Sequence, residues 1–260
     1  MRLDTALVTR GIVDSRTKAQ RRIRAGDVRV EGVVVVKPAQ EIDADASLEL
    51  LGGDDYVGRG ALKLSAACDT WGIQILGVRA LDIGASTGGF TQVLLERGAS
   101  QVVALDVGHD QLHQSLRDDP RVVSFDGVNI RDLDSQWWAH EVGEPPDLIT
   151  CDVSFVSLTQ VIPHVVSALG GCDWIVLIKP QFEVGKGGVR EGIVRDPSLR
   201  ERALRHVLES AAASGLLIRG LMDSPVTGES GNREYLCWLS PTHGSNPPQW
   251  SQQIHQLAHS

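Results

Sequence analysis

Four charged side chains in this 260-residue chain are of the types that activate an alcohol. Lys179 ends the apolar segment Trp-Ile-Val-Leu-Ile-Lys-Pro, and Asp152 follows another apolar segment. Lys63 lies in Gly-Arg-Gly-Ala-Leu-Lys-Leu, and Glu234 lies in Gly-Asn-Arg-Glu-Tyr. Because burial disfavours the charged form of an amine, a lysine at the end of a buried strand can serve as a base. The two lysines could activate an alcohol beside a bound nucleoside cofactor, although each of the four residues alone could be a solvated residue at a strand end.

A glycine-rich turn between the two lysines is the expected cofactor site. The apolar run Ala-Leu-Asp-Ile breaks into Gly-Ala-Ser-Thr-Gly-Gly-Phe and opens a helix, so a ligand can approach the backbone there. The turn lacks the Gly-x-Gly-x-x-Gly order that seats a pyrophosphate, and Asp82 would repel phosphates but suits a cationic amino-acid group. These features favour S-adenosylmethionine over a nicotinamide cofactor. Asp106, at the end of the next strand, is placed to bind ribose hydroxyls. The expected cofactor contacts are Asp82, Gly84, Ala85, Ser86, Thr87, Gly88, Gly89, Phe90 and Asp106.

Three further residues near the expected site have more than one explanation. Asp126 and Asn129 follow the third strand, where they could touch an adenine ring, but a turn at a strand end explains them equally well. Cys151 precedes Asp152 on a strand and should point to the opposite face, so we expect a core cysteine rather than a nucleophile. The sequence Asp-Val-Ser-Phe stands where adenine-N methyltransferases carry Asn/Asp-Pro-Pro-aromatic, which disfavours methylation of a base amino group.

Alternating strands and helices must position these residues. Apolar strands are expected at 78–83, 101–106, 121–125, 147–151 and 173–178, separated by helices at 88–97, 110–117, 156–169 and 198–214. This alternation predicts an α/β fold with a parallel sheet covered by helices on both faces. The segments 216–222 and 234–239 are expected to pair as an antiparallel edge hairpin, and Lys63 is expected just before the first helix of this domain.

A smaller basic module precedes the α/β domain. Helices are expected at 3–10 and 16–25, followed by a hairpin that turns at Gly32 and a strand that ends near Leu50. Residues 1–40 carry nine Lys/Arg against four Asp/Glu, although the chain as a whole has a net charge of -8. A local basic face can bind phosphates whatever the total charge. We therefore expect an α+β module at 1–51, a glycine-rich linker at 52–60 and the large domain at 61–260.

Composition argues against several other classes of protein. The four cysteines form no Cys-x-x-Cys pair and no metal spacing with the eight histidines, so neither a disulfide framework nor a metal site is expected. A reducing cytoplasm is the expected location. No segment has the length and apolarity of a signal peptide core or a membrane span, so no membrane association is expected.

The N-terminal pattern resembles a known RNA-binding domain. Arg-Leu-Asp-x-x-Leu, Gly-x-x-x-Ser-Arg-x-x-Ala, Ile-x-x-Gly-x-Val-x-Val-x-Gly and Lys-Pro together are similar to the alpha-L RNA-binding domain of ribosomal-S-four type. A solvated helix face is the common alternative for such a charge run. The glycine-rich basic segment 185–195 is expected to be a loop near the RNA backbone. The expected RNA contacts are Arg2, Arg16, Lys18, Arg21, Arg22, Arg24, Lys37, Arg59 and Lys186.

The larger domain also resembles a family. The set Lys63, Asp152, Lys179 and Glu234 is similar to the Lys-Asp-Lys-Glu tetrad of ribose 2'-O-methyltransferases of the FtsJ/RrmJ type. With Asp-x-Gly-Ala-Ser-Thr-Gly-Gly-Phe-Thr, Ile-Lys-Pro-Gln-Phe-Glu-Val-Gly-Lys and Ser-Gly-Asn-x-Glu-Tyr, the chain looks like the TlyA family, whose members have also been called hemolysins. The resemblance implies a Rossmann-like class I S-adenosylmethionine methyltransferase fold, with the tetrad as catalytic residues. It further implies 2'-O-methylation of cytidines in large-subunit ribosomal RNA, in some members also small-subunit RNA, and an effect on sensitivity to capreomycin-like antibiotics.

Three other functions compete with this interpretation. A non-catalytic RNA-binding or ribosome-assembly factor would need only the basic module. A membrane-active hemolysin would need an inserting amphipathic segment, and none is evident in the sequence. A nicotinamide oxidoreductase would use the same glycine-rich turn and a similar acidic residue. Binding of S-adenosylmethionine separates the methyltransferase from the non-catalytic RNA-binding factor and from the oxidoreductase. Liposome leakage tests the membrane-active hemolysin.

Overall fold

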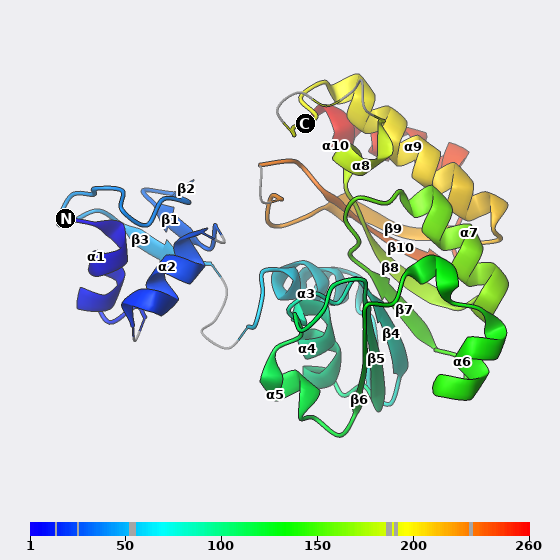
Figure 1. The fold of residues 1–260 in the computed structure, drawn as a ribbon. Helices are drawn as coiled ribbons and strands as arrows, with labels where there is room; N and C mark the ends of the chain where they lie inside the picture. The colour runs from blue at the N-terminus through cyan, green and yellow to red at the C-terminus, as the bar shows by residue number, and fades with distance from the viewer. Residues whose placement is uncertain (14, 25, 52–55, 186–188, 190–191, 229–230) are drawn as a thin grey trace. The chain divides into compact units, whose positions relative to one another are not determined.

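The protein forms two compact units. The first comprises Met1–Arg59 and the second Gly60–Ser260. The structure is a computed structural model (Figure 1), and it describes residues 1–13, 15–24, 26–51, 56–185, 189, 192–228 and 231–260. Within those ranges, none of the helices combines the length and the apolar character that a membrane crossing requires. Part of the segment expected to be a linker, residues 52–55, lies outside the described residues.

The N-terminal unit is a small α+β fold. Helices α1 (Leu3–Thr9) and α2 (Arg16–Arg24) precede a three-stranded antiparallel sheet in the order β2-β1-β3. Glu31 and Gly32 join the first two strands with φ angles of 51° and 76°, which is the backbone of a two-residue hairpin turn. Leu3, Leu7 and Ile23 are fully buried and hold the two helices together. The strands are β1 (Val28–Val30), β2 (Val33–Val34) and β3 (Leu48–Leu50).

The second unit is built on a seven-stranded sheet in the order β6-β5-β4-β7-β8-β10-β9. The first five strands in this order are parallel, while β10 pairs antiparallel with both β8 and β9. The expected parallel sheet and antiparallel hairpin are thereby confirmed, with β9 at the edge. The strands are β4 (Arg79–Ile83), β5 (Gln101–Asp106), β6 (Val122–Asp126), β7 (Leu148–Cys151), β8 (Asp173–Ile178), β9 (Leu217–Asp223) and β10 (Tyr235–Ser240).

Helices cover both faces of this sheet, as is usual where parallel strands are apolar on both sides. Helices α3 and α4 pack together, while α7, α9 and α10 contribute to a large core with Leu81, Ile83 and Trp174. Figure 1 shows these helices around the central sheet. The fold is the Rossmann-like one expected of a class I methyltransferase. The helices are α3 (Gly60–Trp71), α4 (Gly89–Glu96), α5 (Gln114–Arg117), α6 (Ser135–Glu141), α7 (Leu158–Leu169), α8 (Pro180–Glu183), α9 (Pro197–Ala213) and α10 (Ser251–His259), with short 3-10 turns at Ile130–Asp132 and Pro247–Trp250.

Two expected elements differ from the structure. Lys63 lies inside α3 rather than before it, because Gly60 begins the helix within a glycine-containing segment that resembles a linker. The helix expected at 110–117 is confined to α5, since the preceding residues form a turn. Asp110 in that turn has a φ of 53°, and its backbone N–H donates to the Asp126 carboxylate. These contacts connect β5 and β6 instead of extending the helix.

Candidate functional site

The carboxyl ends of the parallel strands bring most of the expected site residues to one edge of the sheet. Ile83 on β4 pairs with both Leu105 on β5 and Cys151 on β7, and Asp106 pairs with Asp126. The residues that follow these strands therefore stand side by side. Parallel α/β sheets bind their ligands at this edge.

Two ion pairs unite the four charged residues expected to be catalytic. Lys63 Nζ lies 2.6 Å from Glu234 Oε2, and the two side chains are 9% and 3% exposed. Lys179 Nζ lies 2.7 Å from Asp152 Oδ1, with 12% and 20% exposure. The ammonium also donates a hydrogen bond to Ser154 Oγ at 2.9 Å, whereas its contact with Asp152 Oδ1 is an ion pair without hydrogen-bond geometry.

Strand pairing and one helix place the two ion pairs near each other. Tyr235 on β10 pairs with Ile178 on β8, so their chain neighbours Glu234 and Lys179 occupy adjacent strand ends. A Cβ placed on Gly60 would lie 3.7 Å from Asp152 Oδ2. The Asp152 carboxylate therefore lies at the N-terminus of α3, one turn before Lys63. The positive end of the helix dipole favours a negative charge there.

The cofactor turn is held in a conformation that requires glycine. Gly84 has a φ of 80°, and a Cβ at this position would lie 2.8 Å from the Asp152 carbonyl oxygen. Gly88 has a φ of 98° and precedes α4, which begins at Gly89. Ala85 is buried, whereas Ser86 and Thr87 are exposed. The turn thus packs directly against the residue that holds Lys179.

The Asp106 carboxylate joins the cofactor turn to the end of β5. Its Oδ2 accepts the backbone N–H of Ser86 at 2.8 Å, and its Oδ1 accepts that of Gly108 at 2.7 Å. Each carboxylate oxygen has two lone pairs, so both retain capacity for a further donor. A half-buried acid with this capacity fits the hydroxyls of a ribose.

Asp82 and Phe90, two of the expected cofactor contacts, have buried side chains that pack inside the unit. Asp82 has no exposed surface, and its oxygens accept the hydroxyls of Thr91 and Thr150 at 2.7 and 2.8 Å. Burial raises the pKa of Asp82 to about 6. Phe90 is 3% exposed and packs near Gly60. Direct contacts between these two side chains and a cofactor stay predictions, and the structure gives both a role in supporting the turn.

Asp126 and Asn129 both have structural partners. Asp126 Oδ2 lies 2.5 Å from the Arg117 guanidinium, which holds the pKa of this carboxyl below its usual range. Asn129 Oδ1 accepts the Arg131 backbone N–H at 3.0 Å and caps a 3-10 turn. The interpretation as residues of a turn explains these side chains, and an adenine contact stays a prediction. The His109 ring packs against Gly127 beside them, where a Cβ would lie 2.3 Å from its Cε1.

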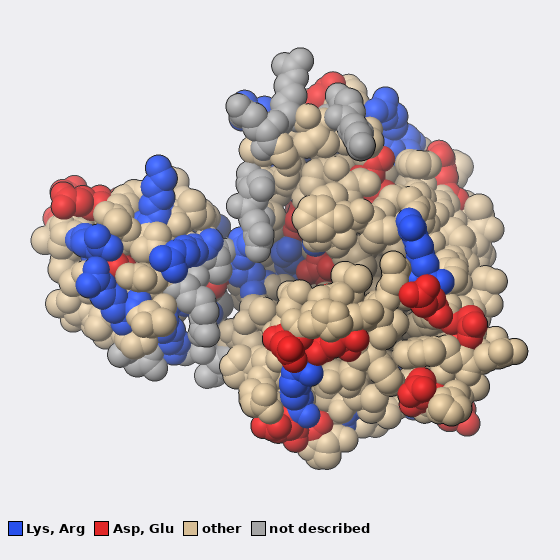
Figure 2. Space-filling model, in the orientation of Figure 1, with Lys and Arg blue, Asp and Glu red and all other residues tan. Residues whose placement is uncertain are grey.

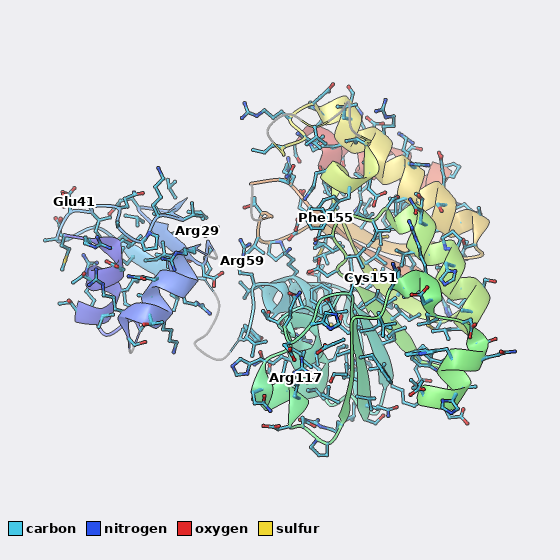
Figure 3. All side chains as sticks on the ribbon, in the orientation of Figure 1. Arg29, Glu41, Arg59, Arg117, Cys151 and Phe155 are labelled. Atoms are coloured by element: carbon cyan, nitrogen blue, oxygen red, sulfur yellow. The ribbon has the colours of Figure 1, made fainter. Side chains whose placement is uncertain are left out.

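Two residues after β7 were not identified as site residues from the sequence. Ser154 accepts the Lys179 hydrogen bond, and Phe155 is 92% exposed with a φ of 66° (Figure 3). The Phe155 ring lies 5.1 Å from that of Phe182. An exposed phenylalanine on a left-handed backbone is costly without a ligand. In the sequence, the one sign that these two residues matter is that Asp-Val-Ser-Phe stands where adenine-N methyltransferases carry Asn/Asp-Pro-Pro-aromatic. Cys151, labelled in the same view, is fully buried, as expected for a core cysteine.

The N-terminal unit presents a basic surface (Figure 2). Arg24 and Lys37 are exposed, and Lys18 is half-buried. Arg2 and Arg16 are 43% and 56% exposed, while each also contacts the buried Asp4 carboxylate. The Arg2 guanidinium holds the pKa of Asp4 well below its usual range.

Two of the expected RNA contacts lie largely inside the N-terminal unit. Arg22 is 7% exposed and lies 3.2 Å from Asp27, and Arg59 is 17% exposed and contacts the same carboxylate. A buried carboxylate needs such partners, which explains why these two arginines point inward. The side chain of Arg21 and the whole of Lys186 lie outside the described residues.

Comparisons with known proteins agree with this geometry. Residues 56–240 match the family model of FtsJ-like methyltransferases, and residues 1–48 match that of the S4 domain. The chain is 46% identical to the 16S/23S rRNA (cytidine-2'-O)-methyltransferase TlyA of Mycobacterium tuberculosis, over 92% of this chain and 89% of the relative. It is 40% identical to the 23S rRNA (cytidine-2'-O)-methyltransferase TlyA of Campylobacter jejuni, over 72% of each chain. A solved structure described as a candidate hemolysin from Streptococcus thermophilus superposes with a TM-score of 0.76 at 36% identity, covering 100% of this chain and 95% of that one.

Proposed function

The chain belongs to the FtsJ-like methyltransferase family, and from this premise we propose that it methylates the ribose 2'-hydroxyl of a cytidine in ribosomal RNA. S-adenosylmethionine is the methyl donor of this family. The single observation that supports the proposal most strongly is the convergence of two Lys–carboxylate ion pairs at the edge of the sheet where the cofactor turn lies. The two relatives named for this reaction match 92% and 72% of the chain.

The turn 84–89 with Asp106 fits the cofactor. Gly84 and Gly88 adopt φ values that favour glycine in the turn before α4, and Asp106 has acceptor capacity for ribose hydroxyls. When bound, S-adenosylmethionine supplies a methyl group made electrophilic by its positive sulfur. The protein then has to place an oxygen nucleophile in line with that methyl group.

In the proposed mechanism Nζ of Lys179 acts as a free amine that accepts the proton of the 2'-hydroxyl, and so becomes the ammonium that Asp152 and Ser154 stabilise. Asp152 and Ser154 hold its ammonium from two directions at 2.7 and 2.9 Å, which fixes the Nζ atom. The more deeply buried Lys63–Glu234 pair orients the ribose and completes the polar environment. Because a ribose hydroxyl is a weak nucleophile, we expect positioning by these four side chains to account for most of the catalysis.

The exposed Phe155 ring supports a nucleic-acid substrate. It is 92% exposed and follows Ser154, which contacts Lys179, so the ring is available to a nucleotide bound beside Lys179. Aromatic rings stack on unpaired bases. We propose that Phe155 holds the base of the target nucleotide.

The N-terminal unit supplies the second part of the proposed RNA interface. Its match to the S4 domain and its exposed basic residues, including Arg24 and Lys37, fit binding to the phosphate backbone of ribosomal RNA or ribosomal subunits. Such contacts carry no sequence information by themselves. In this proposal the unit brings the enzyme to its RNA, and the sheet edge performs the transfer.

The test is transfer of a tritiated methyl group to isolated ribosomal subunits, followed by mapping of alkali-resistant linkages. The Lys179→Ala variant should lose methyl transfer by about 10²-fold or more, since general acid–base groups contribute about that much, while calorimetry should show nearly unchanged cofactor binding. Arg79→Ala is the matched control, because it breaks an exposed 3.0 Å ion pair with Asp147 at the opposite edge of the sheet.

Two results would contradict the proposal. Wild-type activity in the Lys179→Ala variant would remove this residue from the mechanism. A wild-type protein that binds ribosomal RNA but shows no heat of S-adenosylmethionine binding would favour the non-catalytic RNA-binding factor instead.

A further inference from the structure

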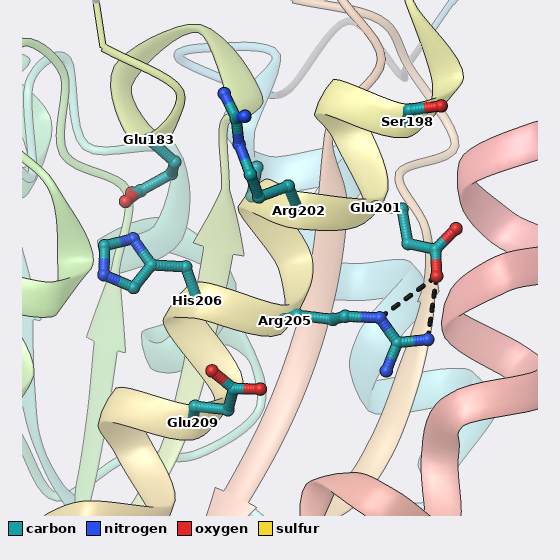
Figure 4. Close-up of a pocket in the computed structure, with 8 residues that line it drawn as sticks. Glu183, Ser198, Glu201, Arg202, Arg205, His206 and Glu209 are labelled. Atoms are coloured by element: carbon teal, nitrogen blue, oxygen red, sulfur yellow. Dashed lines mark hydrogen bonds and ion pairs between the residues drawn. The ribbon is translucent and has the colours of Figure 1, made fainter.

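A cluster of metal-ligating side chains lies on the contact between α9 and α10, two helices that contribute none of the proposed catalytic residues. Glu201 belongs to α9, while His255 and His259 belong to α10. Figure 4 shows Glu201 and Arg205 on α9, at the rim of a surface pocket of about 710 Å³. The histidines are four residues apart, so they lie on one face of their helix.

The three side chains aim their ligand atoms at a common point. Glu201 Oε2 lies 3.0 Å from His255 Nδ1 and 3.1 Å from His259 Nε2. The three atoms all lie within 4.8 Å of one another, and the two imidazole rings stack with centroids 4.2 Å apart. One carboxylate oxygen thus faces two ring nitrogens.

The two carboxylate–imidazole spacings are close to those of a zinc coordination shell, and the two ring nitrogens lie within 4.8 Å of each other. Zinc binds histidine nitrogen and carboxylate oxygen at about 2.0–2.2 Å with tetrahedral geometry, which puts neighbouring ligand atoms roughly 3.3–3.5 Å apart. The two carboxylate–imidazole distances need to open by only a few tenths of an ångström. Two hydrogen bonds satisfy the same atoms when no metal is bound, so the site can exist in both states.

A neighbouring arginine holds the carboxylate in the orientation that a metal needs. Arg205 Nε and one terminal nitrogen donate to Glu201 Oε1 at 3.0 and 2.7 Å, which leaves Oε2 facing the imidazoles. Partners of this kind orient the ligands in established metal sites.

We propose that Glu201, His255 and His259 bind a divalent transition-metal ion of the zinc class, with water at the remaining position. The donor set of two imidazoles and one carboxylate suits zinc, while soft thiolate-seeking and hard oxygen-seeking ions have the wrong ligands here. His255 is 60% exposed and His259 35%, so an ion can enter directly from solvent.

The bound ion would connect α10 to α9 at the end of α10 that contacts Arg233, the residue before Glu234. The Arg200 guanidinium on α9 already donates to the Ala258 carbonyl at 3.0 and 2.7 Å. Arg233, the neighbour of Glu234, donates to Ser260 Oγ at 2.8 Å. A metal bridge would hold the same end of α10. Its role is therefore structural support of the C-terminal part of the second unit.

Metal titration of the chelator-treated, tag-free protein tests the proposal. Zinc chloride in calorimetry should bind with one equivalent, and cobalt(II) should give the visible absorption of a tetrahedral site. His255→Ala, His259→Ala and Glu201→Gln should each weaken binding by about 100-fold or more, since loss even of a partner outside the coordination shell costs 10–100-fold. His140→Ala is the matched control, because His140 is another exposed histidine that lies 2.9 Å from a glutamate, on α6.

The metal titration has one result that supports the site and two that contradict it. Stoichiometric binding that the three variants lose and His140→Ala retains supports the site. Absence of stoichiometric binding in the wild type, or binding that survives in all three variants, overturns it. Thermal unfolding without metal shows whether each variant is folded, and the isosteric Glu201→Gln change tests the site if either alanine variant is not. A metal-dependent rise in the melting temperature of the wild type, absent in Glu201→Gln, is the expected second readout.

Discussion

The Glu234→Gln variant isolates the consequence of burying the Lys63–Glu234 ion pair. The two side chains are 9% and 3% exposed, and glutamine keeps the shape of the acid while removing its charge. The Lys63 ammonium, 2.6 Å from Glu234 Oε2 in the native protein, would then be a buried charge without its counter-ion. Removing one partner of a buried ion pair costs about 3–5 kcal/mol in the free energy of unfolding.

This cost predicts a large change in melting temperature. For a unit of this size each 1 kcal/mol shifts the melting temperature by about 2–4 °C, so Glu234→Gln should lower it by about 6–20 °C. Scanning calorimetry measures the shift, and the tritium assay should show loss of methyl transfer at a temperature where the variant is still folded. Arg79→Ala, which breaks an exposed pair, should change stability by about 1 kcal/mol or less.

A double variant tests whether the unpaired Lys63 ammonium causes the loss of stability in Glu234→Gln. Lys63→Met added to Glu234→Gln removes the ammonium, so most of the lost stability should return, because apolar groups of similar volume often replace buried ion pairs at little cost. Methyl transfer should stay absent. A double variant as unstable as Glu234→Gln alone, or a single variant with an unchanged melting temperature, would refute the reasoning.

Three further predictions follow from other parts of the site. Gly84→Ala puts a Cβ 2.8 Å from the Asp152 carbonyl oxygen at a φ of 80°, so it should weaken S-adenosylmethionine binding in calorimetry, with a strain cost of about 1–3 kcal/mol; unchanged affinity would contradict the assigned turn. Burial raises the pKa of Asp82 to about 6 from 3.8, so the folded state binds this proton more tightly, and its contribution to stability is present below pH 4 and lost as the pH rises to 6. Urea unfolding of Asp82→Asn should therefore show a smaller decline in stability between pH 4 and 6 than the wild type, and equal slopes would refute this. Phe155→Ala should reduce kcat/KM for RNA by an amount that corresponds to about 1–3 kcal/mol of activation free energy. The melting temperature should not change, because the ring is 92% exposed. Full activity would exclude base stacking.

Sequence reasoning succeeded where the chemistry lies at strand ends. Lys179 and Asp152 each follow an apolar run, and the carboxyl ends of parallel strands necessarily meet at one edge. Glu234 could be placed at the same edge because no helix was expected between the last two strands, which predicts that they pair antiparallel. The architecture of the sheet and the approach of Lys179 to Asp152 were therefore predictable from pattern, whereas the grouping of all four residues came from the resemblance to a known tetrad.

The direction of individual charged side chains was not predictable in the same way. Arg22 and Arg24 are both basic residues of α2, yet Arg22 lies buried against Asp27 while Arg24 is exposed. The oxygens of Asp82 accept hydrogen bonds from Thr91 and Thr150 inside the unit, which its sequence context did not indicate, and its expected contact with the cofactor stays a prediction. Such outcomes depend on which partners the tertiary structure supplies to a buried charge.

The proposed metal site departs from the expectation of no metal for a related reason. His255 and His259 have helical spacing, but their third partner, Glu201, lies on another helix. Spacing rules for metal ligands detect neighbours in sequence. They cannot detect a carboxylate that packing of α9 against α10 brings to the same point.

The position of β10 between β8 and β9 has a consequence for synthesis of the protein. A nascent chain emerges from its N-terminus, and domains generally fold as units in that order. Met1–Arg59 has a core of its own, whereas Lys63 obtains its counter-ion only after residue 234 has left the ribosome. Throughout most of translation the polypeptide would thus hold a lysine without its carboxylate, and a methyltransferase that acts on ribosomal RNA would remain inactive beside the ribosome that is making it.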